Sequence, residues 1–520
     1  MKQDGIADGD SGEPWRGAPR TLTASVAVDT AAHPVRSAND RHRSGEVTDL
    51  YCACHERAMV DATRRSVLHA LSATLPVLGG CQTVTESDES TPSDPSPSTS
   101  ASDAARIEVP DRPVLQDEVV APRLSGFDPD TEVTVWAIAR QGSTVESHAT
   151  VRTDERGVAN LADATPVEGT WDGDGEMGFV TSMRRTRNLD RVHTFEDVSL
   201  DTGRPHEERV GLAAVVDGES VATATLRRRT MADSATRTPV DRDGLVGWLY
   251  RPDDGDPRPG VVVLHGGGGR PLHPVGGMLA SRGFAALVVQ YFGDPDPIPD
   301  RQVEVPLGYV GDAVDWFAGH GAVAGERVGL VGWSLGGQLA LLAGTRFDRV
   351  GAVASYAAST VVSLFDTFGG SPWTEDGEPL PYVSVPTDAF ERTQDGVATR
   401  PAFEAGVERA NPDRLARATI PVEEIGGPVL LVSGGDDRVV PAGSQADRAV
   451  DRFEANGRRD DVTHCHYPDA GHRIAIPYGP AGPRRRGDRR VFGGTVEGIA
   501  RADADSWPRL RSFFAGALDR

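Results

Sequence analysis

Five runs of consecutive apolar residues recur in the second half of the chain. They cover residues 260–264, 283–289, 327–331, 350–354 and 429–432. A strand that is apolar on both faces belongs in a parallel sheet covered by helices, because only there does neither face meet water. Helical stretches alternate with these runs from Gly244 onward. The pattern predicts an α/β fold over residues 233–520, with a mostly parallel sheet and helices on both faces.

Short alternating runs separated by turn residues precede this part, over residues 105–232. Residues 133–139 alternate β-branched or aromatic residues with small ones. Residues 212–216 and 220–225 flank Asp217-Gly218, a dipeptide that readily takes the positive φ angles of a type I′ hairpin turn. These strands predict a β-sandwich of immunoglobulin-like size. It contains no candidate nucleophile, so it either helps to wall a pocket of the second part or serves as a spacer.

The first 58 residues are polar and show no hydrophobic periodicity. We expect them to be disordered, or to result from a start codon assigned too early, with Met59 as the alternative start. Residues 82–104 are dominated by Ser, Thr, Pro, Asp and Glu. Such a composition buries too little apolar surface to offset its ordering entropy, which predicts a flexible acidic linker.

Residues 59–81, between these two segments, resemble an export signal. Arg64 and Arg65 precede an apolar stretch that ends at Val77 and is too short to span a bilayer. The next four residues, Leu-Gly-Gly-Cys, end at Cys81 and resemble a lipobox, in which the cysteine becomes the lipidated N-terminus. A buried amphipathic helix is the alternative. Lipidation of Cys81 would anchor the chain at the extracytoplasmic face of the cell membrane, and without it we expect a cytoplasmic protein.

The net charge of the chain limits the classes of partner that it can bind. Its 520 residues include 77 Asp and Glu against 54 Lys and Arg, a formal net charge of −23. Phosphate-backbone binding depends on a basic patch or stripe, so no nucleic-acid partner is expected. Lys2 is the only lysine, and the acidic residues are spread along the chain. This resembles proteins of salt-adapted, halophilic organisms, whose carboxylates keep the surface hydrated; a GC-rich genome that encodes Arg for Lys is the alternative.

The sharpest motif joins the third apolar run to a helical stretch. It reads Gly332-Trp333-Ser334-Leu335-Gly336, followed by Gly337. A serine on so tight a strand-to-helix turn has a strained backbone, and small neighbours let the two elements approach closely. Unpaired amides at the start of the helix favour negative charge there. We therefore take Ser334 as the candidate nucleophile and the Leu335 amide as a candidate oxyanion donor.

A serine nucleophile needs a base, and the base needs an orienting carboxylate. In this fold the acid follows a late strand and the histidine lies in a loop near the end. Asp436 and Asp437 follow the fifth run, 102 and 103 residues after Ser334, and His472 follows Asp437 by 35 residues. The Gly-x-x-Asp register from Gly434 favours Asp437, with Asp436 as the alternative.

Other histidines fit other roles. His464 and His466 lie on the strand before His472 and are expected to be ordinary strand residues. His265 ends the first run and precedes four glycines, a context typical of the loop that supplies a second oxyanion amide, near Gly267. A phosphate-binding loop is the alternative, although no Gly-Lys-Ser/Thr follows. The chain shows no metal-ligand spacing, has only four cysteines, too few for a disulfide framework, and implies no cofactor.

The order of these features resembles that of the acyl-CoA thioesterases related to bile acid-CoA:amino acid N-acyltransferase. The resemblance runs from about residue 105 to the C-terminus and includes Glu168-Gly169-Thr170, Asn456-Gly457-Arg458-Arg459 and Pro477-Tyr478. It implies an α/β-hydrolase fold preceded by a β-sandwich, and a triad of Ser334, Asp437 and His472. Members that conjugate amino acids use cysteine as nucleophile, so Ser334 implies hydrolysis with water as the acceptor.

The implied reaction is two-step hydrolysis of a small-molecule acyl thioester, acyl-CoA, to the free acid and coenzyme A. Residues 361–418 could cap an acyl pocket, and Arg484–486 with Arg489 and Arg490 either meet the phosphates of coenzyme A or form a solvated basic loop. An export signal conflicts with a cytosolic substrate. Two alternatives therefore stay open: an extracytoplasmic carboxylesterase of the dienelactone-hydrolase type, and a catalytically idle surface-binding lipoprotein. The sequence indicates no oligomeric state.

Overall fold

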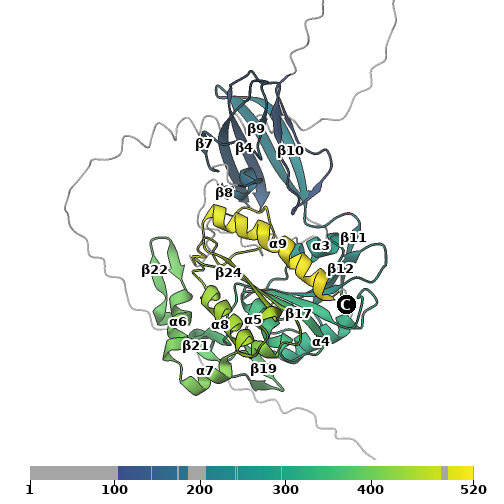
Figure 1. Cartoon of the computed structure of the whole chain (residues 1–520), viewed down its shortest axis with the longest axis vertical. Coiled ribbons are helices and arrows are strands. Elements are labelled where there is room, and N and C mark those ends of the chain that lie inside the picture. The colour runs from purple at the N-terminus through teal and green to yellow at the C-terminus, as the bar shows by residue number, and fades with distance from the viewer. Residues whose placement is uncertain are drawn as a thin grey trace, which may run out of the picture. The chain divides into compact units, whose positions relative to one another are not determined.

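The computed structural model describes residues 104–518, except 142, 172–174, 186–206, 241, 243, 294–295 and 482–489. The segments predicted at 1–58 and 59–81, including Cys81, and nearly all of the linker at 82–104 therefore lie outside the described residues. The described residues form an N-terminal β-sandwich and an α/β part, both within one compact unit of the chain (Figure 1). In this part of the chain, no helix combines the length and apolar character of a membrane span.

The sandwich consists of two layers, whose neighbouring strands are antiparallel except that β2 runs parallel to β10. The smaller layer has the order β1-β3-β6, formed by β1 (Arg106–Glu108), β3 (Arg123–Ser125) and β6 (Ala159–Asn160). The larger layer has the order β2-β10-β9-β4-β5-β7, with β8 paired to β5. Its strands are β2 (Val114–Leu115), β4 (Glu132–Gln141), β5 (Ser143–Arg152), β7 (Glu168–Gly169), β8 (Arg184–Arg185), β9 (Glu207–Val216) and β10 (Glu219–Arg229). A short helix, α2 (Gly178–Thr181), packs on β4 and β5.

The alternating pattern of the sequence corresponds to the faces of these strands. On β4, Val133, Val135 and Ala137 are fully buried in the core between the layers. Asp217 and Gly218 join β9 to β10 with φ angles of 51° and 82°, as the hairpin prediction requires. The sandwich predicted for this region is confirmed.

The α/β part is built on an eight-stranded sheet of order β11-β12-β14-β13-β16-β17-β24-β25. Neighbouring strands are parallel except that β12 runs antiparallel to β11 and β14. The strands are β11 (Ala235–Pro239), β12 (Gly247–Pro252), β13 (Gly260–Leu264), β14 (Ala285–Val289), β16 (Val328–Trp333), β17 (Val350–Tyr356), β24 (Val429–Gly434) and β25 (Val462–Tyr467). This order and the single reversed strand near the start define the α/β-hydrolase fold, and the five apolar runs form its five central, fully buried strands.

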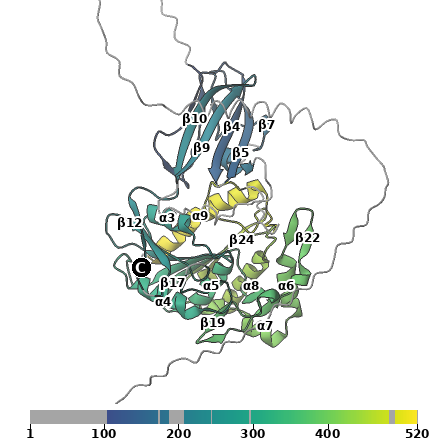
Figure 2. The same cartoon turned by 180° about the vertical axis from the view of Figure 1, so that it is seen from behind.

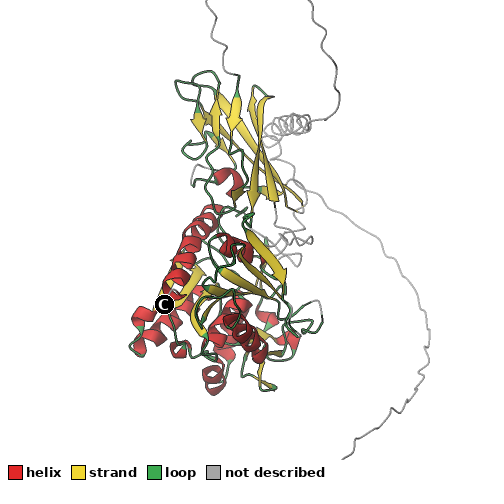
Figure 3. Ribbon diagram, turned by 90° about the vertical axis from the view of Figure 1, so that its right-hand side faces the viewer, coloured by secondary structure: helices red, strands yellow, loops and turns green. Residues whose placement is uncertain are grey.

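Helices cover both faces of this sheet (Figure 3). One face packs against α4 (Leu307–Ala318), α5 (Leu335–Gly344) and α8 (Ala442–Ala455), and the other against α3 (His273–Ser281) and α9 (Val496–Leu518). Strand β13 shows the division, because Val262 and Leu264 lie in the first core and Val261 and Val263 in the second. The predicted two-sided coverage is confirmed.

A long excursion separates β17 from β24. It contains small strands and two helices, which Figure 2 shows around α6, α7 and β22. These are β18 (Ser363–Phe365), β19 (Trp373–Glu375), β20 (Glu378–Pro379), β21 (Val383–Val385), β22 (Glu391–Thr393), β23 (Gly396–Ala398), α6 (Arg400–Arg409) and α7 (Pro412–Ala418). Strand β19 also pairs with β15 (Val305–Pro306). The described residues also include the 3-10 turns η2 (Asp366–Phe368), η3 (Thr387–Ala389), η4 (Val422–Glu424) and η5 (Arg459–Asp461).

Candidate active site

Ser334 lies on the turn between β16 and α5, with φ 55° and ψ −118°. A positive φ is strained for a residue with a side chain and persists only where the surrounding structure enforces it. The flanking glycines explain how the turn closes. A Cβ atom on Gly332 would lie 2.0 Å from the carbonyl oxygen of Gly336, and one on Gly336 would lie 2.3 Å from that of His265. The spacing of the motif therefore follows from close backbone packing around an outward-facing serine.

His472 lies in the loop after β25 and reaches Ser334. Its Nε2 is 3.0 Å from Oγ of Ser334, and its Nδ1 is 2.8 Å from Oδ2 of Asp437. A carboxylate can only accept, so Nδ1 donates to Asp437 and Nε2 is free to accept the serine proton. The main chain of the loop is fixed as well, because the His472 amide donates to the Phe492 carbonyl at 2.8 Å. The three predicted residues thus form one hydrogen-bonded chain.

Asp437 and its neighbour Asp436 face different partners. Asp437 is fully buried, and its Oδ1 accepts from the amides of Val439 and Val440 at 2.8 and 3.0 Å. Asp436 pairs with Arg438 at 2.5 Å and accepts from the Gly494 amide at 2.9 Å. Of the two carboxylates, only that of Asp437 contacts the imidazole of His472. The arrangement favours the register that the glycine-based motif selects.

The proposed oxyanion donors lie at the same opening. Leu335 is the first residue of α5, and Gly267 follows β13 in the glycine-rich loop; both line the cavity that contains Ser334. The loop passes close to Ser334, since a Cβ on Gly266 would be 3.2 Å from the Trp333 carbonyl oxygen and 3.5 Å from Cβ of Ser334. A side chain at Gly266 would press on this turn.

His265 anchors the start of that loop. It is fully buried, and burial lowers its pKa to about 4, so the ring is neutral at pH 7. Its Nδ1 lies 2.8 Å from the Gly266 carbonyl and must donate, while Nε2 accepts from the Tyr291 amide at 3.4 Å. Tyr291 also donates its hydroxyl to the His265 carbonyl and stacks on the ring at 4.1 Å between centroids. A neutral histidine therefore fixes the backbone next to Gly267.

The cavity at Ser334 has about 1140 Å³ of empty space, its open mouth included. Its wall is largely apolar, and the main side chains are Leu364, Phe365, Phe403, Val439, Val440 and Phe492. Leu364, Phe365 and Phe403 come from the excursion predicted as a cap. Apolar walls with a few polar groups at one point are typical of sites that bind small organic ligands. This cavity suits a hydrophobic chain attached to a reactive carbonyl.

Several wall residues escaped the sequence motifs. Gln302 lies beside the glycine loop, where its Oε1 would be 2.8 Å from a Cβ on Gly267. Phe492 stacks on His472 with 6.1 Å between ring centroids. Arg473 lies over Phe492 at 4.4 Å and Arg490 over Phe365 at 5.7 Å. The Gly493-Gly494 pair after Phe492, with φ angles of 75° and 81°, is a local signal of a turn at this wall. Of the predicted arginine group, Arg490 lies in the cavity wall, and Arg484–486 and Arg489 are outside the described residues.

A second Ser-His-Asp chain lies deeper in the sheet. Oγ of Ser433 is 2.7 Å from Nε2 of His464 and 3.0 Å from Nδ1 of His466, and Nδ1 of His464 is 3.2 Å from Asp447. Ser433, however, lies within β24 and is 1% exposed. It has neither the strained turn nor access to the cavity of Ser334. His464 and His466 are strand residues, as expected.

Within the described ranges, no group of three or more His, Cys, Asp or Glu side chains is arranged to hold a metal ion. Cys465 is a free thiol in this part of the chain.

Two family models match the chain. The model described as BAAT / Acyl-CoA thioester hydrolase C terminal matches residues 305–520, and Acyl-CoA thioester hydrolase/BAAT N-terminal region matches residues 117–242. The rat protein named acyl-coenzyme A thioesterase 2, mitochondrial, is 30% identical over 76% of this chain and 86% of its own. Human acyl-coenzyme A thioesterase 1 is 29% identical over 76% of this chain and 93% of its own. A solved esterase of Pyrococcus furiosus is 12% identical and covers 55% of this chain and 91% of its own, with a TM-score of 0.33.

Proposed function

Since the chain belongs to the family of acyl-CoA thioester hydrolases and bile acid-CoA:amino acid N-acyltransferases and is a thioester hydrolase, we propose that it cleaves acyl-coenzyme A with Ser334, His472 and Asp437 as its catalytic residues. One observation carries the catalytic part of this proposal. Ser334 has a positive φ on a strand-to-helix turn, lies 3.0 Å from the imidazole of a buried histidine, and opens into an apolar cavity.

The first step is attack by Ser334 on the thioester carbonyl. His472 takes the serine proton at Nε2, and the bond from Oγ to the carbonyl carbon forms. Asp437 holds the imidazole in the tautomer that leaves Nε2 unprotonated beforehand, and its charge stabilises the imidazolium that results. The buried amides on its second oxygen keep this carboxylate in place. The separation of 3.0 Å is within the range of direct proton transfer.

The negative charge that develops on the carbonyl oxygen is stabilised by the amides of Leu335 and Gly267. The Leu335 amide begins α5, where the helix presents unpaired donors and a partial positive charge. The C–S bond then breaks, and the thiol of coenzyme A leaves with the proton held by His472. Water, deprotonated by the same imidazole, attacks the acyl-serine ester and releases the free acid and the serine hydroxyl.

The cavity supports a substrate with a hydrophobic acyl group. Phe365, Phe403 and Phe492 form much of its wall, and burying a methylene group there stabilises the complex by about 0.8 kcal/mol. An acyl chain placed against these side chains would extend away from Ser334. The expected rate therefore rises with chain length until the cavity is full.

The test is a substrate panel with the full-length chain. Thiol release is measured for acyl-CoA esters of two to eighteen carbons, and phenol release for p-nitrophenyl esters of matching length, over a range of salt in which the protein is folded. We expect thiol release that depends on chain length, and a loss of about 10³-fold or more in kcat on Ser334→Ala. Ser433→Ala is the matched control, because that serine also contacts histidine but lies outside the cavity, and it should retain most of the activity.

The possible outcomes separate the alternatives. Phenol release without thiol release would replace the thioesterase with a carboxylesterase. Neither product, with a folded protein, would sink the catalytic proposal and leave a binding protein.

A further inference from the structure

The loop that carries His472 is attached to two parts of the chain. Its first residues are held by the α/β part. Trp333, next to the nucleophile, donates its indole N–H to the Ile474 carbonyl at 2.8 Å. The Ala475 amide donates to Oδ1 of Asp503 on α9 at 2.6 Å. These contacts fix the loop immediately after the imidazole.

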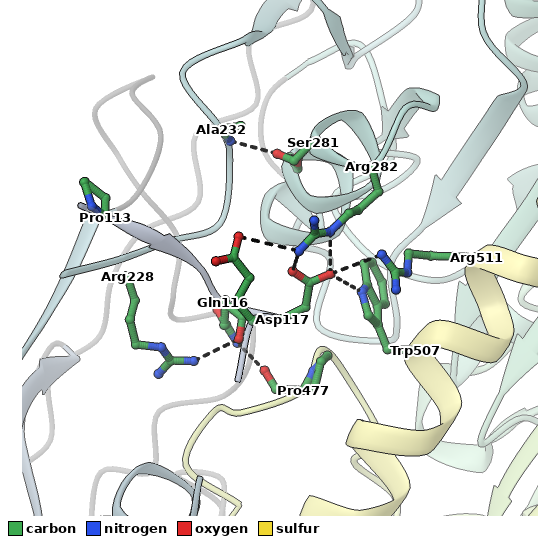
Figure 4. Close-up of polar contacts among 12 residues, drawn as sticks. Pro113, Gln116, Asp117, Arg228, Ala232, Ser281, Arg282, Pro477, Trp507 and Arg511 are labelled. Atoms are coloured by element: carbon green, nitrogen blue, oxygen red, sulfur yellow. Dashed lines mark hydrogen bonds and ion pairs between the residues drawn. The ribbon is translucent and has the colours of Figure 1, made fainter. Parts of the chain in front are cut away.

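Its next residues are held by the sandwich. Gln116, just after β2, donates its side-chain amide to the Pro477 carbonyl at 3.2 Å (Figure 4). Arg228, near the end of β10, donates to the Tyr478 carbonyl. The Ala481 amide donates to the Thr181 carbonyl in α2 at 2.8 Å. Three residues between 477 and 481 therefore depend on partners about 250 to 360 positions earlier in the chain.

Arg228 is an unusual anchor for such a contact. Its side chain is 1% exposed and forms an ion pair at 2.9 Å with Glu208, which is 7% exposed. The same guanidinium also donates to the Gln116 carbonyl at 3.2 Å (Figure 4). Burying a charge is costly unless the charge is paired and hydrogen-bonded, and charged donors make the stronger hydrogen bonds. The buried guanidinium of Arg228 thus contacts Glu208 in the sandwich, Gln116 just after β2, and Tyr478 in the loop that carries His472.

Tyr478 adapts to this position. Its φ of 59° is positive, and its ring packs against the sandwich core. A non-glycine residue adopts this conformation only where its surroundings impose it. The contact with the sandwich therefore sets the backbone of the loop six residues after His472.

A second connection runs through α9. Asp117, whose side chain is 2% exposed, accepts hydrogen bonds from Arg282 at the end of α3 and from the indole of Trp507 on α9, each at 2.9 Å (Figure 4). Arg511, also on α9, approaches within 3.6 Å. Because α9 carries Asp503, the sandwich also orients the group that holds Ala475.

We infer that the β-sandwich positions the catalytic histidine, with Arg228 and Gln116 as positioning residues that act through Pro477 and Tyr478. The inference rests on the proposed role of His472. Without these contacts the loop would shift, and the separation of 3.0 Å between Nε2 and the serine oxygen would no longer be maintained. Misplacement of a catalytic group by about 1 Å reduces rates by about 100-fold. The sandwich therefore supports the position of a catalytic residue, and is more than a spacer or a pocket wall.

The test compares full-length Arg228→Met, Gln116→Leu and Arg229→Met. Arg229 is the matched control, because it adjoins Arg228 on β10 but pairs with Glu207 and Asp233. Each protein is treated with a fluorophosphonate probe. In the labelling reaction, Oγ of Ser334 forms a bond to phosphorus, fluoride leaves and His472 takes the serine proton. The final extent of labelling gives the fraction of molecules with a folded, reactive site. The labelling rate constant measures how well His472 is placed to accept the serine proton. This probe requires no thioester.

We expect full labelling in all three variants. The rate constant should fall about 10- to 100-fold in Arg228→Met and at least threefold in Gln116→Leu, and should stay within twofold of the unmodified chain in Arg229→Met. For thioester substrates, kcat per labelled site should fall with the labelling rate while KM stays within threefold. If Arg228→Met does not fold, Gln116→Leu decides, because it removes one side-chain hydrogen bond and leaves the buried ion pair intact.

A reduced extent of labelling with an unchanged rate constant would mean that Arg228 and Gln116 only stabilise the fold, and would overturn the inference. An unchanged rate in Gln116→Leu would do the same. Failure of the proposed thioesterase function would be evident separately, as an unmodified chain that reacts with the probe but releases no thiol.

Discussion

Asp436 and Asp437 are adjacent carboxylates whose environments make them unequal. Asp437 is fully buried. Its Oδ2 accepts a hydrogen bond from His472, and its Oδ1 accepts from two main-chain amides. Asp436 is about half exposed and is bound to Arg438 and the Gly494 amide. The first is part of the hydrogen-bonded chain that we propose to be catalytic, whereas the second links the loop after β24 to the segment after Phe492.

These differences predict unequal losses. Asp437→Asn preserves the shape of the side chain but replaces an acceptor of the Nδ1 proton, which favours the wrong imidazole tautomer. We expect kcat to fall by about 10³- to 10⁴-fold. Asp436→Asn should reduce kcat less than tenfold, since it weakens an exposed ion pair. Steady-state kinetics of the two variants decide between them, and a larger loss in Asp436→Asn would refute the assignment of the acid.

At the scale of elements, the glycine-rich loop depends on a histidine that stays neutral. Burial lowers the pKa of His265 to about 4, against 6.5 for an ordinary histidine. Between these pH values the unfolded chain binds a proton at this residue and the folded chain does not. Stability contributed by the neutral ring is therefore intact above pH 6.5 and is lost as the pH falls toward 4, by about 3 kcal/mol in total.

His265→Asn tests this linkage. An amide at this position can still donate to the Gly266 carbonyl but takes up no proton. The unfolding free energy of the variant should depend less on pH between 6.5 and 4, with up to one fewer proton taken up on unfolding. Urea titrations across this range give the slopes, and the difference at pH 7 isolates the change in packing. Equal slopes for the two proteins would show that His265 does not titrate as burial requires.

The parts of the fold that the sequence predicts are those with local signals. The central strands are apolar on both faces, and the Asp217-Gly218 turn has a backbone preference of its own. Strand β11, at the edge of the sheet, and its neighbour β12 gave no such signal, because they are partly exposed and have no continuous apolar run. A strand that alternates irregularly at the edge of a sheet is defined by its neighbours rather than by its own residues.

The same division holds for the site. Ser334, Asp437 and His472 follow strand ends in an order that the fold requires, and their side chains lie within hydrogen-bond distance. Arg228 and Gln116 had no such signal. Their partners are main-chain carbonyls 250 and 361 residues away. Because every residue has a main-chain carbonyl, no sequence pattern identifies the one that accepts such a hydrogen bond.

At the scale of the whole molecule, Asp117 joins the sandwich to α3 and α9. Its carboxylate is buried and shared by Arg282, Trp507 and Arg511. Removing this carboxylate leaves the indole N–H of Trp507 and two guanidinium groups, 27% and 31% exposed, without their acceptor, which costs more than the loss of an exposed ion pair. The junction between the two parts therefore depends strongly on this one side chain.

Asp117→Ala should destabilise this junction by about 2 kcal/mol. Calorimetry is the measurement, and we expect the unfolding of the sandwich to separate from that of the α/β part in the variant. Glu118→Ala is the control, because Glu118 is more exposed and lies 3.9 Å from Arg282. If both variants unfold as the unmodified chain does, Asp117 does not couple the two parts.

The excursion between β17 and β24 has its own hydrogen bonding. Strand β18 pairs with β21, and β22 with β23, and in the described chain none of them joins the eight-stranded sheet. This segment nevertheless supplies Leu364, Phe365 and Phe403 to the cavity wall. Mutations here can enlarge or narrow the proposed acyl site without disturbing the strand order that aligns Ser334 with His472. Natural selection can therefore alter the range of acids that the enzyme releases while its chemistry is inherited unchanged.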